Sequence, residues 1–205
     1  MKIVQIAGYL GSGKTTLIIA LSRKVAEAGM KVAILVNDIG SVAVDGKVIE
    51  EYGLTVKDIG GGCICCQVAG TMIKTLETLA KGPKPDVIII EPTGIAVPES
   101  IRQTVMLNAE KTGAVLGPTI VLFDTTRTDK LLTYDTLKRL VKTQIGDADI
   151  VALSKIDLSS VDAADYAEKA VREMNQTAKI IRLSTVTGEG LSVLADRIQE
   201  VTVQA

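Results

Sequence analysis

Short runs of aliphatic and β-branched residues alternate with longer amphipathic stretches from one end of the chain to the other. The short runs predict strands, and several are nearly continuous in Val, Ile and Leu, as is typical of strands covered on both faces. These strands are expected at residues 2–7, 31–36, 86–90, 119–123, 150–153 and 180–183. The amphipathic periodicity predicts helices at about residues 14–28, 68–80, 98–109, 131–144, 163–174 and 191–201.

Alternating strands and helices of this kind indicate right-handed crossover units around a parallel sheet. The pattern therefore predicts an α/β fold, a three-layer αβα sandwich with a mostly parallel sheet. Pro98 suits a first helical turn, and Gly29 suits a helix end. The stretch without a clear pattern is 37–62, in which Asp45-Gly46 is typical of a hairpin turn. A connection of that length is usually functional.

The length of 205 residues favours one domain spanning residues 1–205, and 47% apolar with 23% charged residues is typical of a compact fold. Basic and acidic side chains nearly balance, 23 against 24, which argues against a nucleic-acid binder. The aliphatic runs are far shorter than the roughly 20 residues that span a bilayer, and no signal peptide fits the start of the chain. We therefore expect a cytoplasmic protein with neither a nucleic-acid nor a membrane partner.

A phosphate-binding loop is predicted between the first strand and the first helix. Residues 8–15 fit the pattern G-x-x-x-x-G-K-[ST], and the glycines let backbone N–H groups turn toward phosphate oxygens. Lys14 is expected to reach the β- and γ-phosphates, and the Thr15 hydroxyl to bind Mg²⁺, as in a P-loop NTPase. The alternative is a glycine-rich turn that holds no ligand. The nucleotide-binding residues expected here are Gly11, Ser12, Gly13, Lys14, Thr15 and Thr16.

An acidic group at the end of a neighbouring strand is needed to hold the magnesium of a bound triphosphate. Glu91 directly follows the apolar run 86–90, and the backbone N–H of Gly94 would then sense the γ-phosphate. Asp38, after the second strand, is a further candidate for Mg²⁺ or its bound water. The alternatives are a surface carboxylate at Glu91, because strand-end acids are common in α/β sheets, and a turn-capping role for Asp38. Lys14, Asp38 and Glu91 are the expected catalytic residues.

The tetrapeptide S-K-I-D at residues 154–157 follows a strand and resembles the N/T-K-x-D signature that reads guanine. The Asp157 carboxylate would accept hydrogen bonds from guanine N1–H and N2–H₂, which adenine does not offer, while the stem of Lys155 covers the ring. Ser154 stands where the signature has Asn. A site built on such bonds discriminates by about 10⁴-fold or more, so GTP is expected rather than ATP. The expected base-binding residues are Ser154, Lys155, Asp157, Ser184 and Thr185.

Histidine is absent, so any metal must be held by cysteine, carboxylate, backbone or water. The three cysteines Cys63, Cys65 and Cys66 directly follow a run of three glycines, and a local turn would let their thiolates converge on Zn²⁺ or another thiophilic ion. A structural zinc site usually has four protein ligands, so the fourth would be a carboxylate, a water, a client or a second subunit. Such a site suits a protein that accepts and releases metal. The alternatives are buried cysteines that pack as small hydrophobes and a redox pair.

In their order these motifs resemble those of the CobW/HypB/UreG family of metal-handling GTPases. The resemblance extends to about residue 201 and is most specific in G-G-C-I-C-C, which is similar to the CobW-type branch. It implies that residues 37–40 correspond to the family's N-E-F-G element, with Asp38 in place of the glutamate. It also implies that the three cysteines bind Zn²⁺ or a related ion, that the nucleotide state alters this affinity, and that nucleotide-dependent homodimers form. CobW-type proteins usually add a second domain and often a histidine-rich tract, which this sequence lacks, so the client stays open.

Together these features predict a GTPase with GTP, Mg²⁺ and Zn²⁺ as ligands, in which hydrolysis gates a metal site used for metal delivery or cofactor assembly. The stretch 37–62 would be the switch that links the two sites. No arginine finger or water-orienting Gln is identifiable, so intrinsic turnover is expected on the order of 10⁻⁴ to 10⁻² s⁻¹. The partners expected are a guanine nucleotide, a client metalloprotein and a second copy of the chain. The rivals are a small-molecule kinase and a zinc-dependent interaction module propped by nucleotide.

Overall fold

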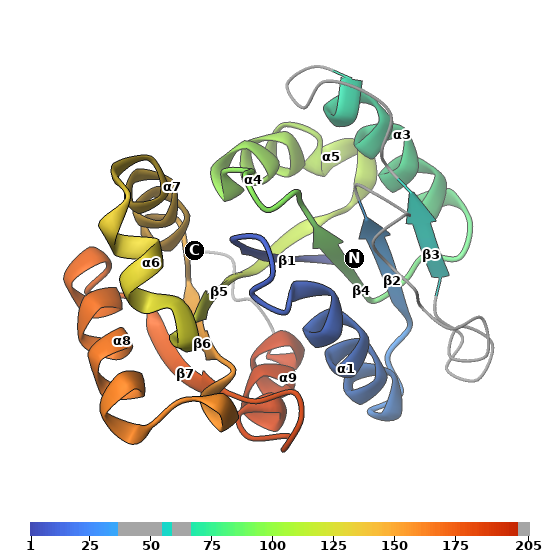
Figure 1. Cartoon of the computed structure of the whole chain (residues 1–205). Helices are drawn as coiled ribbons and strands as arrows, with labels where there is room; N and C mark the ends of the chain where they lie inside the picture. Colours follow the sequence, from blue (N-terminus) through green and yellow to red (C-terminus); the bar gives the residue numbers. More distant parts are fainter. Residues whose placement is uncertain (37–54, 59–66, 201–205) are drawn as a thin grey trace.

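The computed structural model describes residues 1–36, 55–58 and 67–200, in which seven strands form one sheet in the order β3-β2-β4-β1-β5-β6-β7 (Figure 1). Every neighbouring pair of these strands is parallel. The strands β4 and β6 are buried at every residue, which accounts for their continuous apolar sequences. The bounds are β1 (Lys2–Gly8), β2 (Val32–Val36), β3 (Thr55–Asp58), β4 (Val87–Glu91), β5 (Val115–Asp124), β6 (Ile150–Ser154) and β7 (Lys179–Leu183).

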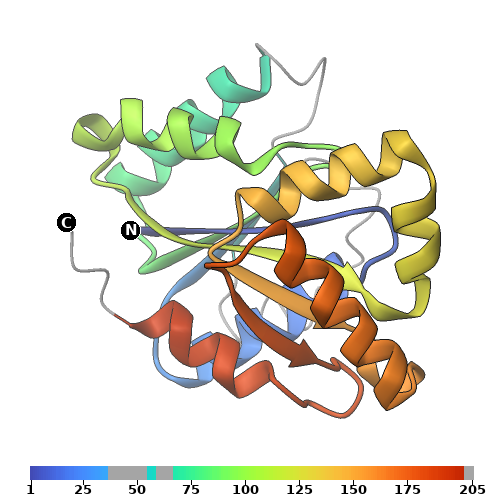
Figure 2. The same ribbon diagram turned by 90° about the vertical axis from the view of Figure 1, so that its left-hand side faces the viewer.

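Helices cover both faces of this sheet. Their bounds are α1 (Lys14–Glu27), α3 (Gln67–Lys81), α4 (Pro98–Leu107), α5 (Ala109–Thr112), α6 (Thr128–Thr133), α7 (Asp135–Gly146), α8 (Val161–Met174) and α9 (Leu191–Gln199), with the 3₁₀ helices η2 (Thr125–Arg127) and η3 (Ile156–Leu158). Buried residues of α1 and α9 pack on one face, and those of α3, α4, α7 and α8 pack on the other. Figure 2 shows α3, α4 and α7 above the sheet and α1 and α9 below it. The predicted three-layer α/β sandwich is confirmed.

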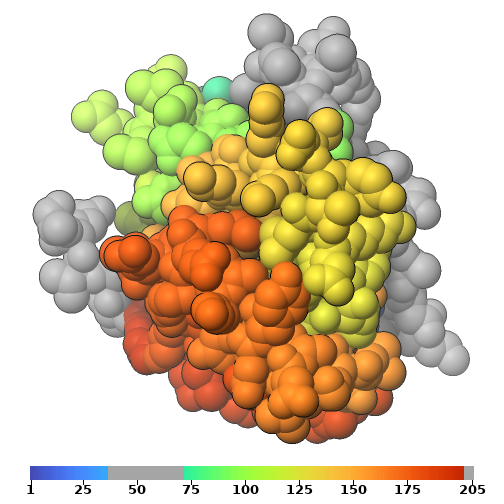
Figure 3. Space-filling model, turned by 60° about the vertical axis from the view of Figure 1, so that its left-hand side comes forward, coloured from blue at the N-terminus to red at the C-terminus, as the bar shows by residue number. Residues whose placement is uncertain are grey.

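Successive side chains along a strand point to opposite faces, so one sheet contributes to the cores on both of its faces. In β1, Val4 and Ile6 belong to the core under α1 and α9, whereas Ile3 and Ala7 belong to the cores on the opposite face. On that opposite side, the segments that carry α6 and α7 lie next to α8 in the space-filling view (Figure 3). None of the helices in the described part of the chain is both long and apolar enough to cross a bilayer.

The strand order determines where a ligand can bind. The strand β1 lies between β4 and β5, with β2 and β3 beyond β4 and with β6 and β7 beyond β5. In a parallel sheet the carboxyl ends of the strands meet at one edge, and a crevice forms where successive connections leave in opposite directions. The loop that follows β1 begins at this point, between the ends of β4 and β5.

The bounds of the strand predicted at 119–123 and of the helix predicted at 98–109 differ in the structure. The strand β5 begins at Val115 rather than at residue 119, because its first residues pair with Lys2 and Ile3 of β1. The register between the two strands shifts after Ile3, which lets the pairing pass Pro118. The helix expected at 98–109 ends at Leu107, and the short α5 follows it.

The helix predicted at residues 131–144 is two helices. Tyr134 has an extended backbone (φ −85°, ψ 118°) and separates α6 from α7, although the apolar periodicity continues across it. Within the stretch expected to be irregular, Thr55–Asp58 forms the edge strand β3 against β2. It has one apolar residue in four, so it lacks the aliphatic run that marks the central strands. The predicted turn at Asp45-Gly46 lies outside the described residues.

Candidate functional site

The loop after β1 has the backbone that its glycine spacing predicts. Gly8, Gly11 and Gly13 all have positive φ, at 138°, 73° and 96°, and Gly13 immediately precedes α1. A Cβ at Gly8 would lie 2.7 Å from the carbonyl oxygen of Leu122 in β5, so only glycine fits there. The loop thus leads into the N-terminus of α1, whose first backbone N–H groups make a favourable site for an anion.

Thr15 and Glu91 meet beside this loop, as the sequence predicts. The Thr15 hydroxyl donates to Oε1 of Glu91 at 3.0 Å, across 76 residues of sequence, because β4 is the neighbour of β1. Both are oxygen ligands of the kind that Mg²⁺ prefers, so the donor set fits that ion. The neighbouring Lys14 is buried, at 8% exposed.

Burial favours the neutral forms of both Glu91 and Lys14. Burial raises the pKa of Glu91, and the hydrogen bond from Thr15 and the charge of Lys14 offset only part of this. Burial also lowers the pKa of Lys14, against a smaller opposite effect of Glu91. Both groups therefore carry desolvation penalties, which a bound phosphate and its cation would relieve.

The segment between β4 and α4 lies against the phosphate loop. A Cβ at Gly94 would lie 2.9 Å from Cδ2 and 3.0 Å from the backbone nitrogen of Leu10, so this glycine approaches the loop closely. On α7, the Nε2 group of Gln144 donates to the carbonyl oxygens of Gly94, at 3.1 Å, and Ala96, at 2.9 Å. Gln144 was not predicted, because its position in an amphipathic helix carries no signal of what it faces.

The loop after β6 is tied to the phosphate loop by two side chains. The Ser154 hydroxyl, where the guanine signature has Asn, donates to the carbonyl oxygen of Ser12 at 2.9 Å. Lys155 has a left-handed backbone (φ 62°), and its Nζ donates to the carbonyl oxygen of Gly11 at 2.8 Å. Ser154 and Lys155 therefore connect the end of β6 and its following loop to the phosphate loop.

The remaining base-binding candidates lie near the ends of β6 and β7. Asp157 is exposed in η3, so its carboxylate is accessible to a ligand. Ser184 is fully buried, and its hydroxyl oxygen accepts hydrogen bonds from the backbone nitrogens of Val186 and Thr187. Thr185 is half-buried. Because the Ser184 side chain bonds within its own loop, any contact of Ser184 with a base would come from its backbone.

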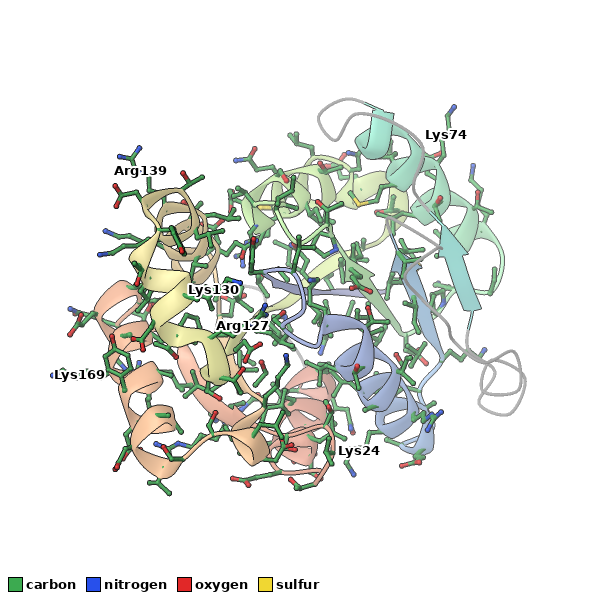
Figure 4. All side chains as sticks on the ribbon, viewed as in Figure 1. Lys24, Lys74, Arg127, Lys130, Arg139 and Lys169 are labelled. Atoms are coloured by element: carbon green, nitrogen blue, oxygen red, sulfur yellow. The ribbon has the colours of Figure 1, made fainter. Side chains whose placement is uncertain are left out.

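Asp124, at the end of β5, is a buried carboxylate that sequence reasoning missed. Its Oδ2 accepts from Nε of Arg127 and from Nζ of Lys155, both at 2.8 Å, and its side chain has no exposed surface. Arg127 also donates to the carbonyl oxygen of Leu10 at 2.9 Å, beside the phosphate loop (Figure 4). Burial alone would raise the pKa of Asp124, but the bonds from Lys155 and Thr126 and the two cations hold it below its usual value. The available signal was an acid directly after a strand, as at Glu91.

Other predicted site residues lie in different places. Thr16 is exposed in the first turn of α1. Asp38 and the three cysteines Cys63, Cys65 and Cys66 are outside the described residues. Among residues 1–36, 55–58 and 67–200, no group of three Cys, Asp or Glu side chains is placed to hold a metal ion.

The sequence matches a known family over most of its length, namely CobW/HypB/UreG, nucleotide-binding domain, at residues 2–182. The zinc chaperone YeiR of Escherichia coli (strain K12) is 32% identical over 172 residues, covering 80% of this chain and 49% of that protein. The zinc-regulated GTPase metalloprotein activator 1 of Schizosaccharomyces pombe is 30% identical over 205 residues, covering 93% of this chain and 47% of that protein. The chain thus spans about half the length of these relatives.

Solved structures show the same fold. The hydrogenase maturation factor HypB of Archaeoglobus fulgidus superposes with a TM-score of 0.69 at 20% identity, over 97% of this chain and 89% of that one. The Zn(II)-bound YjiA GTPase of E. coli gives a TM-score of 0.66 at 24% identity, over 88% and 56%. With the phosphate loop, the strand-end Glu91 and the family match in agreement, this chain belongs to the CobW/HypB/UreG family.

Proposed function

We propose that this chain is a Mg²⁺-dependent GTP-binding and GTP-hydrolysing domain whose nucleotide state controls metal binding by Cys63, Cys65 and Cys66. The observation that supports this most is the pairing of Thr15 with Glu91 next to the buried Lys14, in a member of this family. Lys14 and Glu91 offset only part of each other's desolvation, so a magnesium-bound triphosphate would supply further negative charge at Lys14 and a cation at Glu91.

In the proposed hydrolysis of GTP, each residue of the site has its own role. Lys14 holds the β- and γ-phosphates, and the loop N–H groups orient them for attack by water. Thr15 and Glu91 would hold Mg²⁺, which neutralises charge on the phosphate oxygens. Gly94 contributes its backbone N–H at the γ-phosphate, and Asp38 is the candidate for positioning the attacking water. With neither an arginine finger nor a water-orienting Gln proposed, we expect turnover on the order of 10⁻⁴ to 10⁻² s⁻¹.

The loop after β6 supports a preference for guanine. Asp157 is exposed, and the preceding Lys155 is held by Gly11 and Asp124, so the loop that carries the carboxylate is braced before a base arrives. Preorganisation of this kind limits the entropy lost on binding. Ser184 and Thr185, after the neighbouring strand β7, would complete the base site through their backbone.

Metal handling is proposed from the cysteine motif and from the relatives. The matched proteins YeiR and YjiA are named as zinc chaperones, and by analogy the metal is cargo of this chain rather than a resident cofactor. Three thiolates without histidine form an open donor set, which suits release to a client or cofactor pathway. A nucleotide-dependent homodimer in the cytoplasm is part of the same proposal.

A metal titration under three nucleotide states tests the coupling. Zinc affinity is measured with a competing indicator, because the chain has no Trp, in the presence of Mg²⁺ with GTP, with GDP and without nucleotide. We expect affinities that differ by about tenfold or more between GTP and GDP, equal to about 1.4 kcal/mol of coupling. Cys65→Ser should weaken zinc binding in every state while leaving GDP binding unchanged.

Two outcomes would count against the proposal. Equal zinc affinity in all three states would leave a zinc-binding module that nucleotide merely stabilises. Transfer of phosphate from ATP to a metabolite, without a guanine preference, would instead indicate a small-molecule kinase.

A further inference from the structure

The side chain of Gln144 connects α7 to the segment that follows Glu91. Gln144 is only 1% exposed. The two carbonyls that accept hydrogen bonds from its Nε2 group belong to one short segment, at Gly94 and Ala96. An amide NH₂ group has two hydrogens, so these two bonds use its full donor capacity. A glutamine placed for packing alone would have no reason to reach two carbonyls fifty and forty-eight residues away.

The same segment also contacts the phosphate loop. Gly94 approaches Leu10 so closely that a Cβ would lie 3.0 Å from the Leu10 backbone nitrogen. A backbone bond from Ala96 N to Thr93 O, at 2.9 Å, closes a turn around Gly94. The turn is therefore in contact with both the phosphate loop and Gln144.

The turn also contains an unsatisfied group. The Thr93 Oγ1 atom is buried and has no hydrogen-bond partner among the described residues. A buried hydroxyl without a partner carries a desolvation penalty, which favours other positions of the turn. The two bonds from Gln144 act against that tendency, because moving the turn away would leave its carbonyls without their donor.

We infer that Gln144 is a positioning residue of the nucleotide site: its amide holds the Gly94 turn beside the phosphate loop, so that the chain distinguishes GTP from GDP. The inference rests on the proposed function, because only a γ-phosphate separates the two nucleotides. GDP lacks the group that Gly94 would sense, so GDP binding should not depend on Gln144.

The test variant is Gln144→Met, which keeps an unbranched buried side chain and removes both donors. Affinities for GDP and for a non-hydrolysable GTP analogue are measured with labelled nucleotides in the presence of Mg²⁺. We expect the preference for the GTP analogue over GDP to fall about tenfold, with GDP affinity within twofold of the unaltered chain. Hydrogen exchange without nucleotide should also become faster in the peptide that contains residues 93–97.

Thr112→Val is the matched control, because it also removes two hydrogen bonds of a buried side chain. Thr112 bonds to Asn108 and Ala114 before the start of β5, at the opposite edge of the sheet from the phosphate loop. It should lower thermal stability without changing the ratio of the two affinities.

The outcomes separate the inference from the proposed function. A folded Gln144→Met chain that keeps the full preference, or that gains preference or turnover, overturns the positioning role while the GTPase proposal stands. Unchanged exchange of residues 93–97 overturns it as well, independently of any nucleotide. An unaltered chain that binds neither guanine nucleotide overturns the proposed function and this inference together.

Discussion

Asp124 shows how a single carboxylate organises several parts of the nucleotide site. It accepts bonds from Arg127 and Lys155, and each of these cations also donates to a carbonyl of the phosphate loop, at Leu10 and Gly11 respectively. The carboxylate is buried, whereas each cation remains about a third exposed, at 30% and 34% of its side chain. Loss of this charge would therefore affect both ties to the loop.

Replacing Asp124 by Asn keeps the shape and removes the charge. The pKa of Asp124 is lowered in the folded state, so its contribution to stability is present above the unfolded value of about 4. That contribution is lost as the pH falls through the lower folded pKa. At pH 7 we expect Asp124→Asn to unfold at a lower urea concentration, with a free energy of unfolding reduced by about 1–3 kcal/mol. This is less than the usual loss for breaking a buried pair, because both cationic partners are partly exposed.

Urea unfolding of both chains from pH 7 to pH 3 checks the sign. The difference between them should begin to shrink below about pH 4, where the unfolded carboxylate becomes protonated, and should disappear as the pH falls through the lower pKa of the folded carboxylate. Glu168→Gln is the control, because both side chains of its pair with Arg182 remain partly exposed, at 39% and 38%, and its loss should change stability by less than about 1 kcal/mol. A difference that stays constant with pH would show that the loss in Asp124→Asn is not electrostatic.

At the scale of elements, the connection between β4 and α4 carries both Glu91, a proposed Mg²⁺ ligand, and Gly94, the proposed γ-phosphate contact. Glu91 ends β4 beside Thr15, and Gly94 follows three residues later against Leu10. The parallel pairing of β1 with β4 places this connection at the phosphate loop. Its function therefore depends on how closely two pieces of backbone approach each other.

Gly94→Ala tests that close approach. The added methyl group would lie about 3 Å from the backbone of Leu10, which cannot move without shifting the loop. We expect GTP hydrolysis to fall about tenfold or more, with GDP affinity within about threefold, measured by phosphate release and labelled GDP. Gly146→Ala, where a Cβ meets nothing within 4 Å, should leave hydrolysis unchanged and stabilise α7 by up to about 1 kcal/mol. Full activity in Gly94→Ala would contradict the role of this turn.

At the scale of the whole molecule, the proposed nucleotide site is built from segments at the ends of four strands of one sheet. The residues in question end or follow β1, β4, β5 and β6, and they contact one another through side chains. A ligand that binds the folded chain alone stabilises it by mass action, about 2.7 kcal/mol at one hundred times its Kd. For a chain of this size that corresponds to a rise in Tm of about 5–10 °C.

Thermal unfolding with different nucleotides tests this coupling and the base preference together. GDP with Mg²⁺ should raise the Tm, and ADP at the same concentration should have little effect. Lys14→Ala should abolish the rise, whereas Asp157→Asn should reduce the difference between GDP and ADP. An equal rise in Tm with GDP and ADP in the unaltered chain would show that Asp157 does not read the base.

The phosphate loop and the central strands could be predicted, because the residues that specify each of them are consecutive in the sequence. Residues 8–15 specify a turn by their glycines and a phosphate site by their lysine and threonine, and the aliphatic runs specify the central strands. The resemblance to the CobW/HypB/UreG family was readable from the same motifs, and the family match confirms it. The edge strand β3 and the break at Tyr134 were missed, because a short polar strand and an uninterrupted apolar period carry no local mark.

Tertiary structure alone decided which of these features meet. Glu91 reaches Thr15, Ser154 reaches Ser12 and Gln144 reaches Gly94 across 50 to 142 residues of chain. No local pattern encodes such contacts, because they arise from the strand order, which brings the carboxyl ends of non-consecutive strands to one edge. The sequence by itself determined the groups that can bind a nucleotide, and the arrangement of the sheet determined how those groups hold one another in place.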